Sequence, residues 1–250
     1  MISAVILSHN AARTIRDAIH AVSWCSDVLI LDDNSTDDTP KIAKKLGSRL
    51  ISHSLNNDFA AQRNFALSLA TNQWIFFVDS DEVVPKNLRE EIEQRVGKEQ
   101  GVNGYFVKRT DVFFGKKLLH GEQGNVKLLR LAKKNAGQWD RPVHEAWHIT
   151  GKVGILENPI LHYPHDNVAQ FLDTINDYST QNARYLFSKG KHVSWLEIAA
   201  YHTAKFFKDY IFLGGFLDGT EGAIAAIMMS FHSFLSRAKL WQLWDQIKTS

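Results

Sequence analysis

The chain of 250 residues is 44% hydrophobic and 22% charged, with a net charge of +2. These values suit one large domain, or a domain with a smaller appended one, and exclude a disordered chain. The near-neutral charge gives no basis for nucleic-acid binding, so we expect no nucleic-acid partner. A single cysteine, Cys25, excludes an intramolecular disulfide framework and suits a reducing compartment, so we expect a cytoplasmic protein.

The first hundred residues alternate strand-like and helix-like patterns with short connections, which is typical of βαβ units on a mostly parallel sheet. Residues 1–7 lack the basic segment and the cleavage site of a signal peptide, and they predict a first strand. We expect strands at residues 3–8, 28–32, 48–53 and 74–79. Helices are expected at residues 12–22, 37–46, 59–70 and 85–96.

Polar residues follow three of these strands directly. Residues 8–10 (Ser-His-Asn) end the first strand, Asp32 and Asp33 end the second, and Asp79 and Asp81 follow the fourth. Because the carboxyl ends of parallel strands share one edge, where open α/β sheets bind ligands, we expect these groups to face one cleft. Capping of the next helix explains the Asp-Asp-Asn-Ser-Thr run at residues 32–36 equally well.

The fourth strand is the most informative segment. Its five apolar residues, 74–78, predict a strand buried on both faces, which leads straight into Asp79-Ser80-Asp81-Glu82. Carboxylates this crowded repel one another unless a cation lies between them. An Asp-x-Asp pair suits Mn²⁺ or Mg²⁺, with further oxygen ligands supplied by a bound diphosphate. An acidic cap on a helix that begins at Pro85 is the alternative.

Residues 104–161 contain short β-like segments with glycines at many turns, which predict a loop-rich half of the same domain. Arg130 suits the oxygens of a bound diphosphate, and an exposed strand position is its alternative. Trp139 offers either a stacking face for a sugar or a core residue. His162 and His165 have a metal-binding spacing, but a close pair is unsurprising in a chain with 11 histidines.

The chain turns helical after residue 165, with helices expected at 168–188 and 195–212. We therefore expect a catalytic domain at 1–165 and a C-terminal helical subdomain at 166–250. The apolar stretch 211–235 is interrupted by Asp218, Glu221 and His232, and does not predict a membrane-spanning helix. Aromatic residues beside lysines in this subdomain are compatible with contact with an anionic membrane surface, and packing against the first domain or a second copy explains them equally well.

Four motifs, in order along the first ninety residues, resemble the inverting glycosyltransferases of family 2. They are AVILSHN at 4–10, LDDNSTD at 31–37, QRN at 62–64 and VDSDE at 78–82. Residues 140–145, Gly151, Gly154 and residues 161–163 resemble the bacterial branch that contains lipopolysaccharide core β-glucosyltransferases. The resemblance implies the GT-A fold, a Rossmann-like α/β mixed sheet flanked by helices, here with a C-terminal helical extension.

The resemblance also implies roles for individual residues. It implies that Asp81 is the main metal ligand and that Asp79 supports the metal or contacts the ribose. The residues that it implies for the nucleotide or the diphosphate are Leu7, Ser8, His9, Asn10, Asp33, Arg63 and, from the reasoning above, Arg130. Inverting transfer needs a group that deprotonates the acceptor, and we assign this role to Glu145, with His144 orienting it or the acceptor.

These roles predict a metal-dependent hexosyltransferase that moves glucose from UDP-glucose to a hydroxyl of a lipopolysaccharide core or similar glycolipid. We expect it in the cytoplasm or peripherally on the inner face of the cytoplasmic membrane. Transfer to a polyprenyl phosphate, which needs no base, and an inactive nucleotide-sugar-binding module are the alternatives. A nucleotidyltransferase would usually carry a glycine-rich loop after the first strand, and residues 8–13 contain no glycine.

Overall fold

The computed structural model describes residues 1–98, 101–141 and 145–249. It divides into two compact units, the first formed by Met1–Arg109 and Val126–Tyr163, and the second by Thr110–Asn125 and Pro164–Ser250. The expected boundary between the catalytic domain and the helical subdomain, at residue 165, lies close to the point where the chain enters the second unit for the second time, at Pro164. The inclusion of Thr110–Asn125 in the helical unit was not predicted.

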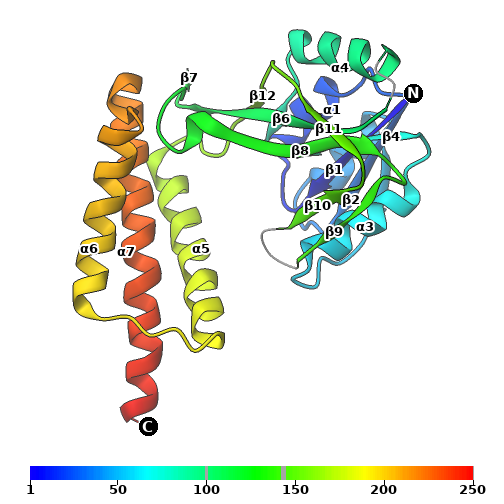
Figure 1. Ribbon diagram of the computed structural model, residues 1–250. Coiled ribbons are helices and arrows are strands. Elements are labelled where there is room, and N and C mark those ends of the chain that lie inside the picture. The colour runs from blue at the N-terminus through cyan, green and yellow to red at the C-terminus, as the bar shows by residue number, and fades with distance from the viewer. Residues whose placement is uncertain (99–100, 142–144, 250) are drawn as a thin grey trace. The chain divides into compact units, whose positions relative to one another are not determined.

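The first unit is built on a mixed sheet with the strand order β3-β2-β1-β4-β8-β6-β12-β5, with β11 on β6 (Figure 1). The strands β1 to β4 are parallel, and β8 pairs antiparallel with both β4 and β6. The bounds are β1 Ile2–Ser8, β2 Asp27–Asp32, β3 Arg49–Ser52, β4 Trp74–Asp79, β5 Glu82–Val83, β6 Val102–Phe113, β8 Val126–Lys133, β11 Lys152–Ile155 and β12 Ile160–His162.

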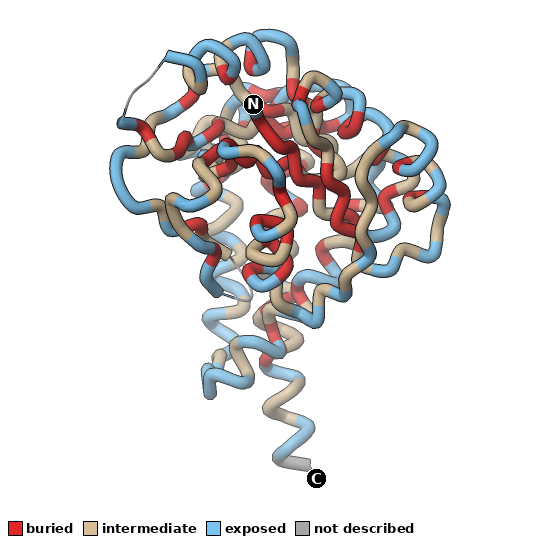
Figure 2. The backbone as a smooth tube through the Cα atoms, turned by 90° about the vertical axis from the view of Figure 1, so that its right-hand side faces the viewer, coloured by how far each residue is buried: buried red, intermediate tan, exposed pale blue. Residues whose placement is uncertain are grey.

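Helices cover both faces of this sheet because its central strands are apolar on both. On β4, Trp74, Phe76 and Val78 belong to one core cluster, together with residues of α1 (Ile15–Ala21), α2 (Thr39–Lys45) and α4 (Lys86–Lys98). The alternate residues Ile75 and Phe77 belong to the cluster that contains α3 (Phe59–Leu69). The central strands accordingly consist largely of buried residues, which are coloured red in Figure 2. The α/β prediction with its expected first four strands and helices is confirmed.

A separate two-stranded hairpin, β9 (Gly137–Asp140) and β10 (Ala146–Ile149), belongs to the α3 side of the sheet. Trp139 and Trp147 are paired across the hairpin, and their rings stack at a centroid distance of 5.1 Å. Both rings also meet the edge of the Phe77 ring, each at 5.2 Å. This packing anchors the hairpin on β4, and Glu145 directly precedes β10.

The second unit contains α5 (Val168–Ser188), α6 (Trp195–Phe207) and α7 (Gly219–Thr249). A π-helical turn, η2 (Lys208–Phe212), and a 3₁₀ turn, η3 (Gly215–Asp218), connect α6 to α7. The short strand β7 (Lys116–Lys117), paired with the end of β6, and η1 (Gln123–Asn125) complete it. The helices α5 and α6 with η2 match the predicted ranges, whereas α7 was not predicted.

The helices of the second unit are long and partly apolar. Within the described part of the chain, no helix by itself is long and apolar enough to cross a membrane. Residues Trp195–Phe212 and Gly215–Ile247 meet that requirement only together, as a pair bent by 67°.

Candidate functional site

The carboxyl ends of β1, β2 and β4 lie side by side at one edge of the sheet, as expected. Ser8 is in register with Asp32, and Leu7 with Asp79. Asp32 is buried, and its carboxylate accepts hydrogen bonds from Ser8 Oγ at 3.0 Å and from the Ser35 backbone N–H at 2.9 Å. Asp32 therefore holds the loop after β2 in shape.

The next residue, Asp33, is the partly exposed member of the pair, with a side chain 27% exposed. Its Oδ1 accepts a hydrogen bond from the Leu55 backbone N–H at 2.9 Å, and its Oδ2 lies 3.7 Å from Nδ1 of His9. Asn10 is exposed beside them and accepts a hydrogen bond from the Thr36 backbone N–H at 2.8 Å. The structure thus brings together His9, Asn10 and Asp33, with the half-buried Leu7 on the strand behind them.

Asp79 is bound by arginine side chains. Arg130 Nη1 donates to Asp79 Oδ1 at 3.1 Å, and Arg130 Nη2 also pairs with Asp79 Oδ2. Arg63 Nη2 donates to Asp79 Oδ1 at 3.2 Å. Burial opposes ionisation of Asp79, but the Arg130 and Arg63 guanidinium groups outweigh it and hold the pKa of this carboxyl well below its usual range.

Glu82 is the second carboxylate that Arg130 binds in this network. It is fully buried, accepts a hydrogen bond from the Asp79 backbone N–H at 2.8 Å, and receives Arg130 Nη2 at 3.1 Å. Burial raises the pKa of the Glu82 carboxyl, and the nearby charge of Asp79 adds to this, against the opposing effect of Arg130. Glu82, which had no predicted role, therefore supports the Asp-x-Asp loop.

Arg63 connects Asp79 to Glu145, although Glu145 lies far along the chain. Arg63 Nε donates to Glu145 Oε1 at 3.1 Å, and its guanidinium lies over the Trp139 ring at 4.7 Å. Arg63 is 4% exposed, whereas the Glu145 side chain is 20% exposed. The candidate base therefore reaches the same sheet edge as the Asp-x-Asp loop through a buried cation.

Asp81 faces a histidine instead of an arginine. The antiparallel pairing of β12 with β5 sets His162 opposite Glu82, and His162 Nε2 lies 3.4 Å from Asp81 Oδ2. The Tyr163 backbone N–H donates to the Asp81 carbonyl at 2.9 Å, which fixes the loop against β12. Carboxylate and imidazole are both metal ligands, so Asp81 and His162 are the residues here that can hold a divalent ion.

Other predicted residues have different surroundings. Among the described residues, no group of three His, Cys, Asp or Glu side chains converges as a metal site. His165 belongs to the second unit, where its ring stacks on Phe171 at 4.2 Å, whereas His162 lies beside Asp81 in the first unit. Trp139 is 8% exposed and packs in the core, which favours the core alternative. His144 lies outside the described residues.

Two cavities of the first unit lie away from this sheet edge. One of about 380 Å³ is lined by residues such as Thr71, Asn103 and Lys133, and one of about 400 Å³ by residues such as Asn64 and Gln138. Thr71 precedes β4, so the first cavity lies at the opposite end of that strand from Asp79. The site is instead defined by its charged side chains.

The sequence did not predict that His162 lies beside Asp81. It also did not predict that Gln62 and Asn64 of the Gln-Arg-Asn motif form hydrogen bonds with neighbouring segments. Gln62 Nε2 donates to the His53 carbonyl at 2.8 Å, and Asn64 exchanges two hydrogen bonds of 2.9 Å with the backbone of Trp139. Three consecutive polar residues inside a predicted helix were the available signal, because such residues need partners when buried. No sequence signal indicated that β12 pairs with β5.

Known proteins resemble this chain in sequence. Residues 3–158 match the family model described as glycosyl transferase family 2. An uncharacterized glycosyltransferase of Rickettsia prowazekii is 28% identical over 255 residues, which cover 97% of this chain and 87% of the relative. The lipopolysaccharide core biosynthesis glycosyltransferase LpsC of Rhizobium meliloti is 25% identical over 248 residues, covering 96% of this chain and 92% of LpsC.

Solved structures that resemble the chain include glucosyl-3-phosphoglycerate synthase from Mycobacterium tuberculosis in complex with Mn²⁺, uridine diphosphate and phosphoglyceric acid. The sequence identity is 22%, the TM-score is 0.39, and the match covers 44% of this chain and 43% of that one.

Proposed function

Since the chain belongs to glycosyltransferase family 2 and has its GT-A fold, we propose that it is a hexosyltransferase. It transfers glucose from UDP-glucose to a hydroxyl of a lipopolysaccharide core or similar glycolipid, with inversion at the anomeric carbon. One observation carries the proposal: Arg63 ties Glu145 to Asp79 at the same sheet edge as Asp81. A proton acceptor and a diphosphate-binding loop are thereby joined in one site. The lipopolysaccharide role of LpsC supports the choice of acceptor.

The donor would bind along the ends of β1, β2 and β4. Asp33, with its partly exposed carboxylate, would accept hydrogen bonds from the base, between His9 and Leu7. Arg63 Nη1 is buried and has no hydrogen-bond partner among the described residues, which supports a contact with a diphosphate oxygen. Ser8 and Asn10 would shape the loop around the nucleotide, as their hydrogen bonds indicate.

The residues present fit a divalent ion. Asp81 and His162 offer one carboxylate and one imidazole, and Mn²⁺ or Mg²⁺ commonly keeps few protein ligands and takes the others from phosphates and water. Both oxygens of Asp79 are engaged by arginines, so we assign Asp79 the supporting part and Asp81 the main one. When bound, the ion would neutralise the charge that develops on the leaving diphosphate.

The protein's own groups would then perform the acid–base part. Glu145 would take the proton of the acceptor hydroxyl as that oxygen attacks the anomeric carbon from the face opposite the diphosphate. Arg63 would hold the Glu145 carboxylate in place, since it is itself fixed between Asp79 and Trp139. Arg130 would keep Asp79 ionised and oriented. We place the reaction in the cytoplasm, at the membrane that carries the acceptor.

A donor screen tests this proposal. Purified protein, Mn²⁺ and a truncated core glycolipid are incubated with individual nucleotide sugars, and the glycolipid is analysed by mass spectrometry. We expect a mass increase of one hexose with UDP-glucose. A parallel screen uses polyprenyl phosphate as the acceptor, and hexose transfer to it but not to the glycolipid would contradict the choice of a glycolipid acceptor. The absence of transfer from any nucleotide sugar to either acceptor would favour an inactive binding module.

A further inference from the structure

Helix α6 has no buried residue, although most of its residues are apolar. Leu196, Phe207 and Ile211 are 59%, 50% and 47% exposed, and Ala200 and Thr203, which lie between them at helical spacing, are also exposed. Spacings of three and four residues place Leu196, Ala200, Thr203 and Phe207 on one side of α6. Together with Ile211 of η2, they form what we call the outer face of α6. Apart from Thr203, this face is an apolar strip open to its surroundings.

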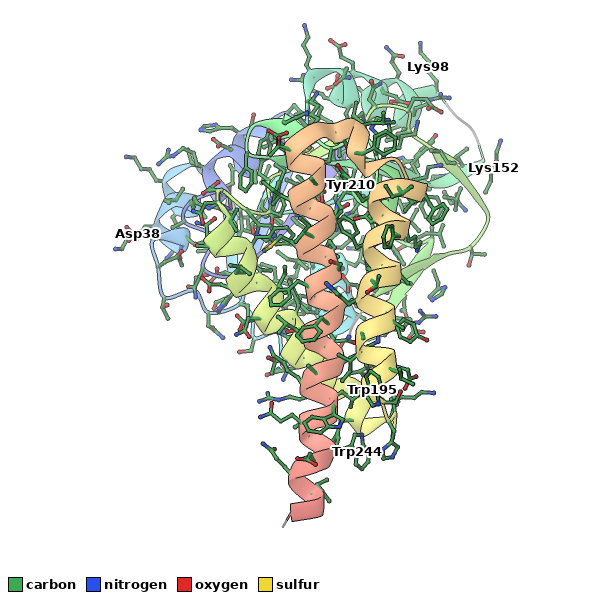
Figure 3. All side chains as sticks on the ribbon, turned by 90° about the vertical axis from the view of Figure 1, so that its left-hand side faces the viewer. Asp38, Lys98, Lys152, Trp195, Tyr210 and Trp244 are labelled. Atoms are coloured by element: carbon green, nitrogen blue, oxygen red, sulfur yellow. The ribbon has the colours of Figure 1, made fainter. Side chains whose placement is uncertain are left out.

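The other side of α6 packs on α7. The His202 ring lies 6.0 Å from the Phe234 ring of α7, and the Arg237 guanidinium lies 4.0 Å over the Tyr201 ring. Helix α7 lies between α5 and α6 in both side views (Figures 1 and 3). The exposure of the outer face therefore does not result from a loosely attached helix.

The strip continues into the turn between α6 and α7. Phe212, Phe216 and Leu217 are 81%, 48% and 59% exposed. Buried carboxylates fix this turn: Asp209 accepts a hydrogen bond from the Glu122 backbone N–H at 2.6 Å, and Asp218 accepts one from the His120 backbone N–H at 2.8 Å. The exposed apolar side chains consequently sit on a rigid support.

The turn also packs too closely to accept a side chain at its glycines. A Cβ added at Gly222 would lie 2.1 Å from the Gly215 carbonyl oxygen, and one added at Gly215 would lie 2.9 Å from the Asp209 carbonyl oxygen. Such close approach of backbone to backbone requires glycine. The conformation that directs Phe212 and Leu217 outward is therefore specified by the sequence.

Charges around the turn are sorted by sign. Asp209 and Asp218 are 1% and 4% exposed, whereas the side chains of Lys208 and Lys116 are 62% and 46% exposed. Lys117, beside Lys116 on β7, is exposed as well. Lys208 and Lys116 pair with Glu122 and Glu221, whose side chains are 26% and 28% exposed, so the most exposed charges beside the turn are those of the lysines.

We infer that the outer face of α6 and the turn after it bind an anionic lipid bilayer, with the helix lying along the headgroup boundary. An apolar helix face flanked by lysines is the combination that binds such surfaces. Trp195, labelled in Figure 3 at the start of α6, is 71% exposed, and Phe212 at the end of η2 is 81% exposed. They supply the aromatic side chains favoured at such a boundary. Flanking lysines favour anionic headgroups over a second copy of the same cationic surface.

This inference deepens the proposed function and rests on it in one respect, because a glycolipid acceptor resides in a bilayer. The test needs neither donor nor acceptor. The full chain is mixed with vesicles of phosphatidylglycerol and phosphatidylethanolamine, and the bound fraction is measured by flotation. We expect the wild-type protein to float with the vesicles and the Phe207→Gln/Ile211→Gln variant to bind about tenfold more weakly or worse, because two large apolar side chains lose their burial.

A matched control uses exposed apolar residues of α5. Leu172 and Tyr185 are 40% and 54% exposed, and the Leu172→Gln/Tyr185→Gln variant should bind vesicles as the wild type does. Wild-type protein that does not float, or equal flotation of the Phe207→Gln/Ile211→Gln variant, would overturn the inference. So would a lipid-free dimer, seen by sedimentation equilibrium, that this variant dissociates. Hexose transfer to a detergent-solubilised acceptor, measured separately, would reveal failure of the proposed function by itself.

Discussion

Glu145 is joined to the rest of the site by its ion pair with Arg63, and that contact leads to the first prediction. Replacing Glu145 with Gln keeps the size of the side chain but removes the proton acceptor. We expect kcat for transfer to a hydroxyl acceptor to fall by about a hundredfold or more, the usual contribution of a general base. Steady-state kinetics with the Glu157→Gln variant as a control, an exposed glutamate paired with Lys108, checks this.

The outcome also separates two acceptor classes. If the Glu145→Gln enzyme retained most of its rate, the acceptor would not need deprotonation. A polyprenyl phosphate, which is already an anion, would then replace the hydroxyl acceptor.

Arg130 neutralises two carboxylates in a buried network. The substitution Arg130→Met leaves Asp79 and Glu82 facing each other, and we expect the free energy of unfolding to fall by about 3 kcal/mol. Urea denaturation measures the loss. The Lys108→Met variant, which breaks an exposed ion pair with Glu157, should cost about 1 kcal/mol or less. Equal losses for the two variants would contradict the structural role given to Arg130.

The buried thiol of Cys25 leads to a prediction of how stability depends on pH. Burial raises the pKa of this thiol to about 12, and the charge of Glu93 adds to the shift. An unfolded thiol ionises near pH 8.5, so the folded state retains its proton while the unfolded state loses it, and stability falls as the pH rises above about 8.5. The stability advantage of the wild type over Cys25→Ala should therefore shrink between pH 8 and pH 10, by up to about 2 kcal/mol. Guanidinium denaturation at both values measures this, and a constant difference would contradict the shift.

Among the secondary-structure elements, the β9–β10 hairpin matters most for the site because it carries Glu145. The Asn64 side chain holds β9 by two hydrogen bonds to the backbone of Trp139. We expect Asn64→Ala to lower the free energy of unfolding by about 1–3 kcal/mol, since buried backbone groups lose their partners. It should also lower kcat, through displacement of Glu145. A Ser68→Ala variant on the exposed side of the same helix is the control, and unchanged kcat in Asn64→Ala would contradict this link.

The elements also show what the sequence could predict. Residues 1–98 alternate strongly between apolar strands and amphipathic helices, so their order and the meeting of Ser8, Asp33 and Asp79 followed from local patterns. The contacts of His162 with Asp81 and of Arg63 with Glu145 join segments about eighty residues apart. Such contacts depend on antiparallel pairing and on hairpin packing, which no local pattern specifies.

Helix α7 illustrates a different failure. Four glycines at 214, 215, 219 and 222 predict breaks, and in fact they build the turn that starts the helix. Gly219 has φ +68° and is the first residue of α7. The polar residues Asp218 and Glu221, which argued against a spanning helix, pair with His120 and Lys116. Whether a glycine breaks a helix or permits a close contact depends on the backbone that approaches it. That backbone belongs to residues elsewhere in the chain.

At the scale of the whole molecule, the family model accounts for residues 3–158, and these include each carboxylate and arginine of the proposed site, whereas His162 lies just beyond them. The helices α5 to α7 of the second unit lie beyond the family match, and the exposed strip on α6 is the basis of our inference that this unit binds a membrane. A chain built in this way would combine a site for a soluble nucleotide sugar with a surface for the bilayer that holds its acceptor.

The most direct test of the central claim is hexose transfer measured with and without a divalent ion, for the wild type and for Asp81→Asn. We predict that the wild type transfers hexose from UDP-glucose to the core glycolipid with Mn²⁺ or Mg²⁺ and loses that activity with EDTA. Asp81→Asn should lose at least about a hundredfold, since a metal ion contributes several kcal/mol to the stabilisation of a leaving diphosphate. Full activity of the wild type in EDTA, or of Asp81→Asn with the metal, would contradict the account.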